Sequence, residues 1–336
     1  MVTTLLGISC FPEGHVLSLG MLGMHGMAYA NMAVNAADVI IAIGMRFDDR
    51  ATAKVSAFAP HAHIIHIDID PAEIGKNVRV DVPIVGDVKI ILNALNKLIV
   101  STEHIGWVQQ LDDWRREHPS TAIRDSQGLL PQFVIRQIYE VTQGEATIVT
   151  GVGQNQMWAA HYYWYNRPNS LISSGGLGTM GFELPAAMGA KVGCPEDTVW
   201  CIAGDGGFQM TIQELATIVQ EKVAVKIAII NNGYLGMVRQ WQELFYERRY
   251  VATPLSGPDF VKIAEAYGIP GLKVRHKEEV IPAIEQAMAH QGPFLIDFVV
   301  EPEENVYPMV PPGASIAEIL EEPKKEVAIW PQRSTP

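Results

Sequence analysis

Two strand-like segments that each end in a short polar turn constrain the fold of this chain most. The first, Trp200–Ala203, leads into Gly204-Asp205-Gly206-Gly207, and the second ends in Asn231-Asn232. The helix-like segment Thr211–Gln220 joins them, and this order predicts two parallel strands with a right-handed crossover. Asp205 and Asn232 should therefore lie side by side at the carboxyl edge of a parallel sheet, where open α/β sheets bind ligands.

This pair of side chains predicts a site for a metal ion and a diphosphate. Carboxylate and amide oxygens are hard ligands suited to Mg²⁺. The glycines leave room for a diphosphate, and the start of the following helix favours anionic oxygens. Asp-Gly or Asn-Gly alone is common in turns, so the prediction depends on both lying within one strand–helix–strand unit. The spacing Thr211-x-x-Glu214 also predicts a capping box that starts the helix at Thr211.

NAD binding is the second interpretation of the same region. Gly176-x-Gly178-x-x-Gly181 fits the dinucleotide fingerprint, and Asp205 follows Gly181 at the distance of a ribose-binding acid. However, residues 173–176 offer no clear hydrophobic strand before the glycines, and NAD binding leaves Asn232 without a role.

Strand-like and helix-like segments alternate along the rest of the chain, which predicts an α/β fold with a parallel sheet. We expect strands at 37–44, 64–70, 146–150, 198–203, 225–231 and 294–300, and helices at 26–36, 88–99, 131–141, 211–220, 259–267 and 280–290. The opening residues 2–7 look like a strand that enters an established sheet. Because nothing precedes this strand to pair with it, we expect part of the domain to be missing.

Composition excludes several classes of partner. The 336 residues carry 25 Lys and Arg against 37 Asp and Glu, a net charge of −12, which disfavours binding to nucleic acids and anionic membranes. The sequence shows no apolar run of membrane-spanning length, and its first residues do not show the basic segment and apolar core typical of a signal peptide. The three cysteines have no metal-binding spacing. We therefore expect a cytoplasmic protein with no nucleic-acid or membrane partner.

Several longer segments carry a family resemblance. They are Gly204-Asp205-Gly206 followed after 24 intervening residues by Asn231-Asn232, NNGYLGMVRQWQELFYERRY (231–250), GVGQNQMWAA (151–160), GMLGMHG (20–26) and RFDDR (46–50). Together they resemble the large, catalytic subunits of acetohydroxyacid (acetolactate) synthases, which are thiamine-diphosphate enzymes, over about residues 1–316. The resemblance implies an α/β fold in which a parallel-sheet thiamine-diphosphate-binding domain follows the C-terminal part of a Rossmann-like FAD-associated domain. The implied bounds are 1–100 for the FAD-associated part, 101–130 for a connector, 131–317 for the diphosphate-binding domain and 318–336 for a mobile tail.

The resemblance assigns roles to residues of the second domain. It implies that Asp205, Asn232 and the carbonyl of Tyr234 bind Mg²⁺. The implied thiamine-diphosphate positions are Gly178, Met180, Gly204, Asp205, Gly206, Gly207, Asn232, Gly236 and Met237, with Met180 supporting the bent form of the cofactor. Met237 and Trp241 match residues on the substrate side, and at a spacing of four they would share one helical face. Trp241 matches the family's determinant of preference for 2-oxobutyrate.

The resemblance also implies an FAD site in the first domain, at Gly23, His25, Arg46, Asp68 and Asp87. Arg50 matches the arginine that binds the carboxylate of the incoming 2-oxoacid, a role that suits the fork geometry of a guanidinium group. Taken alone, the segment Arg46–Arg50 is typical of an exposed cluster of ion pairs.

The implied activity is decarboxylation of pyruvate and carboligation to a second pyruvate or to 2-oxobutyrate. The products, 2-acetolactate and 2-aceto-2-hydroxybutyrate, are precursors in isoleucine and valine biosynthesis. The implied cofactors are thiamine diphosphate, Mg²⁺ and FAD, and the implied partners are further copies of the chain, as a dimer or tetramer, and a regulatory small subunit. The glutamate that activates the cofactor belongs to a pyrimidine-binding domain absent from this sequence, so we expect the chain alone to be inactive. The alternatives are a non-catalytic remnant and another 2-oxoacid thiamine-diphosphate enzyme.

Overall fold

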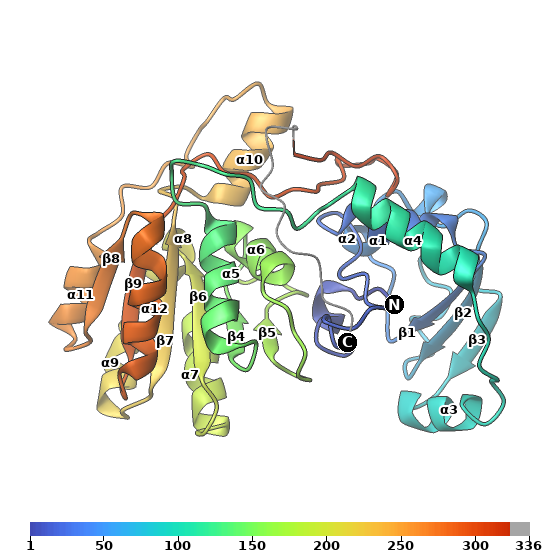
Figure 1. Ribbon diagram of the computed structural model, residues 1–336, viewed down its shortest axis with the longest axis horizontal. Coiled ribbons are helices and arrows are strands. Elements are labelled where there is room, and N and C mark those ends of the chain that lie inside the picture. Colours follow the sequence, from blue (N-terminus) through green and yellow to red (C-terminus); the bar gives the residue numbers. More distant parts are fainter. Residues whose placement is uncertain (323–336) are drawn as a thin grey trace. The chain divides into compact units, whose positions relative to one another are not determined.

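The computed structural model describes residues 1–322 and consists of two compact units (Figure 1). The first unit contains Met1–Thr4, Leu19–Thr121 and residues 307–322, and the second contains Leu5–Ser18 and Ala122–Val306. Each unit is built on its own parallel β-sheet, so the predicted α/β class is confirmed. Of the predicted mobile tail, residues 323–336 lie outside the described part, whereas Leu320 pairs with Met309 through a short antiparallel bridge.

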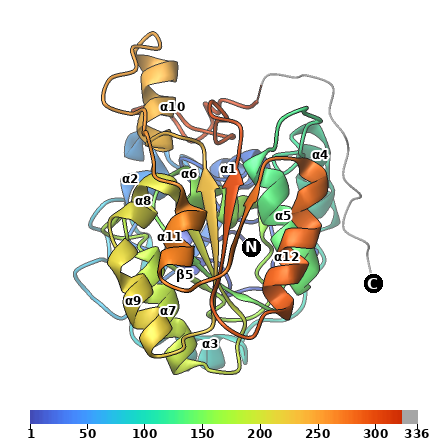
Figure 2. The ribbon, with the colours of Figure 1, turned by 90° about the vertical axis from the view of Figure 1, so that its left-hand side faces the viewer.

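The second unit holds a six-stranded sheet in which every strand pairing is parallel. The strand order is β5-β4-β6-β7-β9-β8, with β4 at Thr147–Thr150, β5 at Leu171–Ser173, β6 at Val199–Gly204, β7 at Val225–Asn231, β8 at Gly271–Val274 and β9 at Phe294–Val299. Helices cover both faces: α5 (Pro131–Thr142), α6 (Gln154–Tyr162), α7 (Glu183–Gly193), α9 (Leu215–Gln220), α11 (Phe260–Ala266) and α12 (Val280–Ala289). Figure 2 shows α7, α9 and α11 on one side of the sheet and α5 and α12 on the other.

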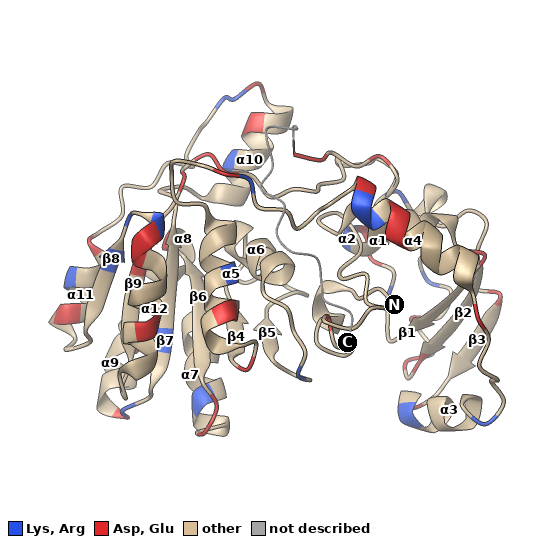
Figure 3. Cartoon of the chain, in the orientation of Figure 1, with Lys and Arg blue, Asp and Glu red and all other residues tan. Residues whose placement is uncertain are grey.

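The two-sided cover explains the residue pattern of the central strands. All of β4 and nearly all of β6, β7 and β9 are buried, because a parallel sheet packed on both faces needs continuous apolar runs. Figure 3 agrees, since most of the strand ribbon carries no charged residue and the charges lie mainly on helices and loops. A carboxylate at the end of a central strand is therefore unusual in this sheet, because the neighbouring strand residues are mostly apolar and uncharged.

The first unit holds a three-stranded parallel sheet in the order β1-β2-β3. Its elements are α1 (Ala28–Ala36), β1 (Val39–Ile43), α2 (Asp49–Thr52), β2 (His63–Asp68), β3 (Val82–Val85), α3 (Val88–Leu95) and α4 (Ile105–Glu117). One face of the sheet packs into a core that includes Ala42, Phe47 and Ile64. Val39 and Ile41, which point to the other face, are about half exposed.

The prediction of a strand at residues 2–7 is wrong. Only Thr3 pairs with Met21, in an isolated bridge, and the chain then turns into a short 3-10 helix at Leu5–Gly7. The physical reason is that Leu5 and Leu6 pack against the backbone at Gly175, where a Cβ would lie 2.7 Å from Cδ2 of Leu6. Leu5 and Leu6, which belong to the second unit, therefore contact a turn of that same unit and form no strand.

Candidate active site

The structure brings Asp205 and Asn232 together at the carboxyl edge of the six-stranded sheet. Strands β6 and β7 are neighbours, with Gly204 paired to Ile230, so both strands end at the same level. Asp205 is the first residue of the short helix α8 (Asp205–Gln209), and Asn232 follows the last residue of β7. The backbone N–H of Gly233 donates a hydrogen bond to the Asp205 carboxylate, which ties the two turns directly to each other.

The Asp205 carboxylate is buried without a compensating cation. Its side chain is only 2% exposed, and this burial raises the pKa of Asp205 to about 7, although backbone N–H groups, including that of Gly206, favour the charged form. The negative charge of Asp297 raises the pKa further, and within residues 1–322 no positive side chain opposes it. A metal cation bound beside this buried carboxylate would stabilise its ionised form.

Asn232 is held by a network of amide side chains that the sequence analysis did not assign. Asn232 Nδ2 donates to Oε1 of Gln154 at 3.0 Å, while its Oδ1 accepts from the backbone N–H of Tyr234 at 3.1 Å. Gln154 Nε2 donates to Oε1 of Gln240 and to the carbonyl of Glu304, both at 2.9 Å. These bonds give the Asn232 amide one orientation, with its oxygen on the side of the turn that leads to Tyr234.

Gln154 and Asn155 are functional candidates that residue-by-residue reasoning missed. They begin helix α6 directly after β4, the neighbour of β6, at the same carboxyl edge. Asn155 Nδ2 donates to the carbonyl of Ile202, and its Oδ1 lies 3.4 Å from the place of a Cβ on Gly204. A signal was present, because GVGQNQ follows a predicted strand just as the Asp205 turn does.

Several predicted site glycines are required by close packing. A Cβ on Gly236 would lie 2.1 Å from Oε1 of Gln154, and one on Gly206 would lie 2.9 Å from Leu235. The Met180 methyl group would lie 3.6 Å from that same Cβ on Gly206, so the segment containing Gly178 and Met180 reaches the Asp205 turn. Gly178 has a positive φ of 66°, which also favours glycine.

The predicted capping box at Thr211 is wrong. The chain becomes helical at once after β6, because α8 begins at Asp205, and it passes through a 3-10 turn before α9 begins at Leu215. Thr211 Oγ1 donates to the carbonyl of Gly181 at 3.0 Å and makes no cap. A tertiary hydrogen bond has therefore taken the hydroxyl that the sequence pattern assigned to the helix start.

The expectation that no strand precedes the glycines at 176–181 is wrong. A short strand, β5, does precede the glycines at 176–181, contrary to the expectation from residues 173–176. What counts against NAD is the strand order, because β4 lies between β5 and β6. A dinucleotide site needs its ribose-binding acid on the strand next to the glycine-rich turn, and Asp205 follows β6.

Helix α10 (Gly236–Phe245) presents Met237 and Trp241, which are both partly buried. Trp241 stacks edge-on against Phe245, with ring centroids 5.4 Å apart. The helix is anchored by the fully buried Arg239, whose guanidinium donates to Glu243 at 2.6 Å and to Oδ1 of Asn305 at 2.6 Å. Its hydrogen bonds to Asn305 and to the carbonyl of Glu304 therefore hold α10 on the segment that follows β9.

The first unit gathers the residues predicted to contact FAD and the 2-oxoacid around one sheet edge. Arg46 follows β1, Asp68 ends β2, and Asp87 follows β3, so all three lie near the carboxyl ends of parallel strands. A Cβ on Gly23 would lie 2.2 Å from the carbonyl oxygen of Arg50. His25 follows in the same loop, before α1.

Most polar groups at this edge already have partners. Asp87 Oδ1 caps α3 by accepting from the N–H of Ile90 at 3.1 Å, and Asp68 Oδ1 accepts from the N–H of Asp70 at 2.9 Å. Arg46 pairs with Asp48 at 3.2 Å, and Arg50 pairs with Asp49 at 3.5 Å, and both arginine side chains are largely exposed to solvent. The cluster is therefore compatible with either reading of this segment, an ion-pair surface or a ligand site.

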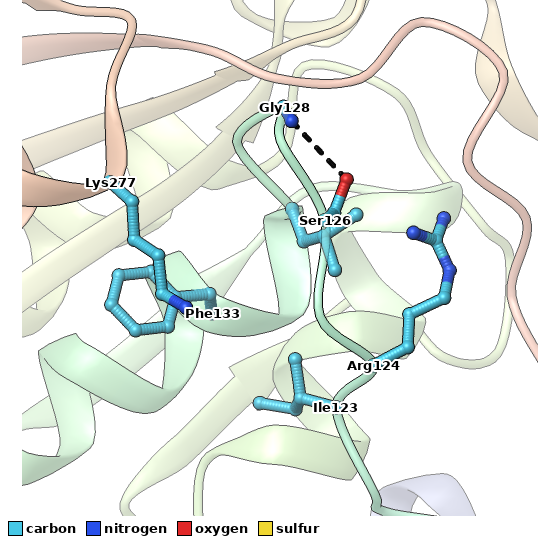
Figure 4. A pocket seen from close by; sticks show the side chains of 7 residues that line it. Ile123, Arg124, Ser126, Gly128, Phe133 and Lys277 are labelled. Atoms are coloured by element: carbon cyan, nitrogen blue, oxygen red, sulfur yellow. Dashed lines mark hydrogen bonds between the residues drawn. The ribbon is translucent and has the colours of Figure 1, made fainter. Parts of the chain in front are cut away.

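A separate small cavity in the second unit does not compete with this site (Figure 4). It is lined by Ile123, Arg124, Ser126, Gly128, Leu130, Phe133 and Lys277 and has a volume of about 10 Å³, the size of a single water molecule. Its cations are engaged, since Arg124 pairs with Glu304 and the Lys277 ammonium lies 5.0 Å from the centre of the Phe133 ring.

Comparison with known proteins agrees with the geometry. The model of the thiamine pyrophosphate enzyme C-terminal TPP binding domain matches residues 151–298, which include both polar turns. The model of the thiamine pyrophosphate enzyme central domain matches residues 1–95. The chain belongs to the thiamine pyrophosphate enzymes. This family places Asp205 and Asn232 in a cofactor-binding domain and leaves the NAD interpretation without support.

Its relatives within the family are acetolactate synthases, as the sequence resemblance predicted. The chain is 49% identical over 332 residues to "Acetolactate synthase" of Mycobacterium bovis and to "Acetolactate synthase large subunit IlvB1" of Mycobacterium tuberculosis. It is 47% identical over 334 residues to "Acetolactate synthase 1, chloroplastic" of Oryza sativa. These alignments cover 95% of this chain but 54%, 54% and 52% of the relatives, so the chain spans about half of their length.

The residues present fit a metal-bound diphosphate. The buried, uncompensated Asp205 carboxylate and the oriented Asn232 amide are the donors that Mg²⁺ prefers, and close-packed glycines keep both turns free of side chains. In the described range there is no cluster of three His, Cys, Asp or Glu residues that would favour a softer metal. The same range contains no helix with the length and hydropathy needed to span a membrane.

Proposed function

We propose that this chain binds Mg²⁺ and thiamine diphosphate at the carboxyl edge of its six-stranded sheet and contributes this site to an acetolactate synthase. The observation that carries the proposal is the placement of buried Asp205 beside oriented Asn232. The proposed Mg²⁺ ligands are the Asp205 carboxylate, Oδ1 of Asn232 and the carbonyl of Tyr234. When bound, thiamine diphosphate supplies the electron sink for decarboxylating a 2-oxoacid.

The reaction that we propose decarboxylates pyruvate and joins the remaining two-carbon unit to a second pyruvate or to 2-oxobutyrate. The family name of the relatives and their identity of 45–50% support this choice over another 2-oxoacid enzyme. The products would be 2-acetolactate and 2-aceto-2-hydroxybutyrate, which places the chain in isoleucine and valine biosynthesis.

The chain's own residues would bind and orient these molecules. Gly178 and Met180 would contact the aminopyrimidine, and Met180 already reaches the Asp205 turn. Met237 and Trp241 share one face of α10 and would contact the second substrate. Arg50 would bind the carboxylate of the incoming 2-oxoacid through its guanidinium fork.

FAD is the third proposed cofactor, held by the first unit at Gly23, His25, Arg46, Asp68 and Asp87. Support comes from the carboxyl ends of β1, β2 and β3, which bring three of these residues to one sheet edge. We also propose a homo-oligomer, a dimer or tetramer, and a regulatory small subunit. The cytoplasmic location stays a prediction from composition; the plant relatives are named as chloroplastic.

The test is acetolactate formation from pyruvate with thiamine diphosphate, Mg²⁺ and FAD. It is run on this chain alone and on this chain mixed with a polypeptide that supplies the portion of a relative lying outside the alignment. We expect activity only in the mixture, because the chain spans about half of its relatives and contains no assigned activating glutamate. Activity of the chain alone would place that acid within these residues.

A direct binding measurement separates the remaining alternatives. Calorimetric binding of thiamine diphosphate that requires Mg²⁺, with no acetolactate formed in either mixture, would favour a non-catalytic remnant. Binding with release of CO₂ from pyruvate but no acetolactate would favour another 2-oxoacid enzyme. Absence of Mg²⁺-dependent binding would contradict the proposed site itself.

A further inference from the structure

Glu183, the first residue of α7, is the most buried acid near the proposed diphosphate site. Its side chain is 0% exposed, and neither carboxylate oxygen accepts a hydrogen bond of normal geometry. Buried polar groups almost always have partners, so an orphaned carboxyl group in a well-packed region requires an explanation. None of the roles assigned above uses this residue.

The carboxyl group lies between the ends of the two neighbouring strands β4 and β6. A Cβ on Gly151, directly after β4, would lie 2.7 Å from Cδ of Glu183. A Cβ on Gly207, two residues after the proposed metal ligand, would lie 2.5 Å from Oε1 of Glu183. The Glu183 carboxyl group therefore occupies the side-chain space of both glycines and packs beneath the turn that would hold the diphosphate.

The charges around Glu183 argue for a proton on its carboxyl group. Burial raises the pKa of Glu183 to about 7, and the nearby N–H groups of Glu183 and Gly181 oppose this only in part. On β6, the thiol of the fully buried Cys201 faces it, and its pKa is raised by burial and by the charge of Glu183. The other ionisable groups on the packed elements are Asp205 on α8, Glu214 on the adjoining 3-10 turn, Lys226 on β7 and Lys191 further along α7.

We propose that Glu183 is a positioning residue that supports the diphosphate turn as a neutral carboxylic acid and keeps or takes up a proton when the anionic cofactor binds. The inference rests on the proposed function, because it requires a diphosphate on the other side of the backbone turn from Glu183. An ionised Glu183 carboxylate and this diphosphate would repel each other across the turn. A second buried negative charge at this place would repel the cofactor. The neutral acid fills the same space without that repulsion.

Isothermal titration calorimetry of Mg²⁺–thiamine diphosphate in buffers of different ionisation enthalpy tests the proton directly. At pH 8 the wild-type chain should take up close to one more proton per cofactor than Glu183→Gln, which is nearly isosteric and cannot ionise. Between pH 7 and pH 8.5 the wild-type affinity should fall about tenfold more than that of the variant. Glu285→Gln, an exposed glutamate on α12, is the matched control and should behave as wild type.

Equal proton uptake by the wild type and Glu183→Gln would overturn the inference, because Glu183 would then exchange no proton when the cofactor binds. The proposed function would still stand, since the cofactor would have bound. Absence of Mg²⁺-dependent binding by the wild type would overturn the proposed function. In that case the pH dependence of unfolding, measured without cofactor, decides the protonation state. The wild type should lose stability between about pH 5 and pH 7 relative to Glu183→Gln, and identical profiles would show that the carboxyl group is not held neutral.

A pair of variants tests the shared space independently of pH. Gly207→Ala alone should clash with the Glu183 carboxyl group and weaken cofactor binding, since the added Cβ would lie 2.5 Å from Oε1. Removing that carboxyl group in Glu183→Ala/Gly207→Ala should restore much of the affinity. A double variant no better than Gly207→Ala would contradict the placement of Glu183 beneath the turn.

Discussion

At the scale of single residues, the metal affinity proposed for this site depends most on the buried carboxylate of Asp205. Its neighbours along the chain are a buried strand and three glycines, so nothing local offers the carboxylate a cation. Burial then raises the pKa of Asp205 to about 7. An ionised Asp205 therefore lowers the stability of the metal-free protein, and a bound cation would offset this loss.

Replacing Asp205 should abolish metal-dependent cofactor binding. We expect Asp205→Ala to remove detectable Mg²⁺-dependent binding of thiamine diphosphate in calorimetry, because the only carboxylate among the proposed ligands is lost. Asp125→Asn, an 82% exposed acid of the same unit, serves as the control and should leave binding unchanged. Unchanged binding by Asp205→Ala would show that Asp205 is not a ligand of the metal ion.

The raised pKa of Asp205 also predicts how stability depends on pH. The folded chain keeps this proton up to about pH 7, whereas the unfolded chain loses it near pH 3.8. The free energy of unfolding should therefore fall as pH rises between these values, by on the order of 4 kcal/mol for this one carboxyl group. Urea unfolding of the metal-free wild type and Asp205→Asn at pH 5 and pH 7.5 measures the difference, which should be smaller in the variant because only the contribution of Glu183 and other acids remains.

Gln154 should affect metal binding through Asn232. Gln154→Ala removes the acceptor that holds Asn232 Nδ2 at 3.0 Å, so the amide loses its single orientation. Residues that orient a ligand in this way typically change metal affinity about 10–100-fold. Mg²⁺ titrations at saturating thiamine diphosphate would show the loss, and Gln220→Ala, on the exposed end of α9, should show none.

At the scale of elements, the site depends on how α10 is attached. Arg239 bonds α10 to the segment after β9 through Glu304 and Asn305, and its guanidinium also lies 5.9 Å from the ring of Tyr234. The same helix carries Met237 and Trp241. The position of the proposed substrate-side residues is therefore set by hydrogen bonds from a buried guanidinium to residues 65 and 66 positions further along the chain, which no local sequence pattern reveals.

Breaking this attachment should increase local unfolding of α10 while the six-stranded sheet stays folded. We expect Arg239→Met to cost about 3–5 kcal/mol, because Glu243 loses its buried cation and Oδ1 of Asn305 loses its guanidinium donor. Limited proteolysis should then cut within or beside residues 236–250. Arg248→Met removes an exposed partner of the same Glu243, at 3.0 Å, and should leave the cleavage pattern as in wild type.

Elements that alternate clearly in hydrophobicity were predicted well from the sequence, and those that depend on distant contacts were not. The strand at 225–231 matches β7, and the helix at 131–141 matches α5 to within one residue. Short edge strands such as β5 and β8 were missed, because three or four partly exposed residues carry little periodicity. Helix α7 was missed because its start, Glu183, is buried against glycines that are distant in sequence.

At the scale of the whole molecule, the two units have separate sheets and separate hydrophobic cores. Ligands should therefore stabilise the units independently. We expect differential scanning calorimetry to show that Mg²⁺–thiamine diphosphate at 100 times its Kd stabilises the second unit by about 2.7 kcal/mol, while FAD acts on the first. A single transition raised equally by both ligands would contradict this independence.

The sequence by itself determined the α/β class, the strand–helix–strand unit and the convergence of Asp205 and Asn232. These follow from local rules, since hydrophobic periodicity defines strands and a right-handed crossover brings their carboxyl ends together. The tertiary structure alone decided that Gln154 orients Asn232, that Thr211 bonds to Gly181 instead of capping a helix, and that Glu183 fills the space of Gly151 and Gly207. Each of these depends on atoms brought together from different strands or loops, and no pattern along the chain encodes which polar group becomes buried beside which backbone turn.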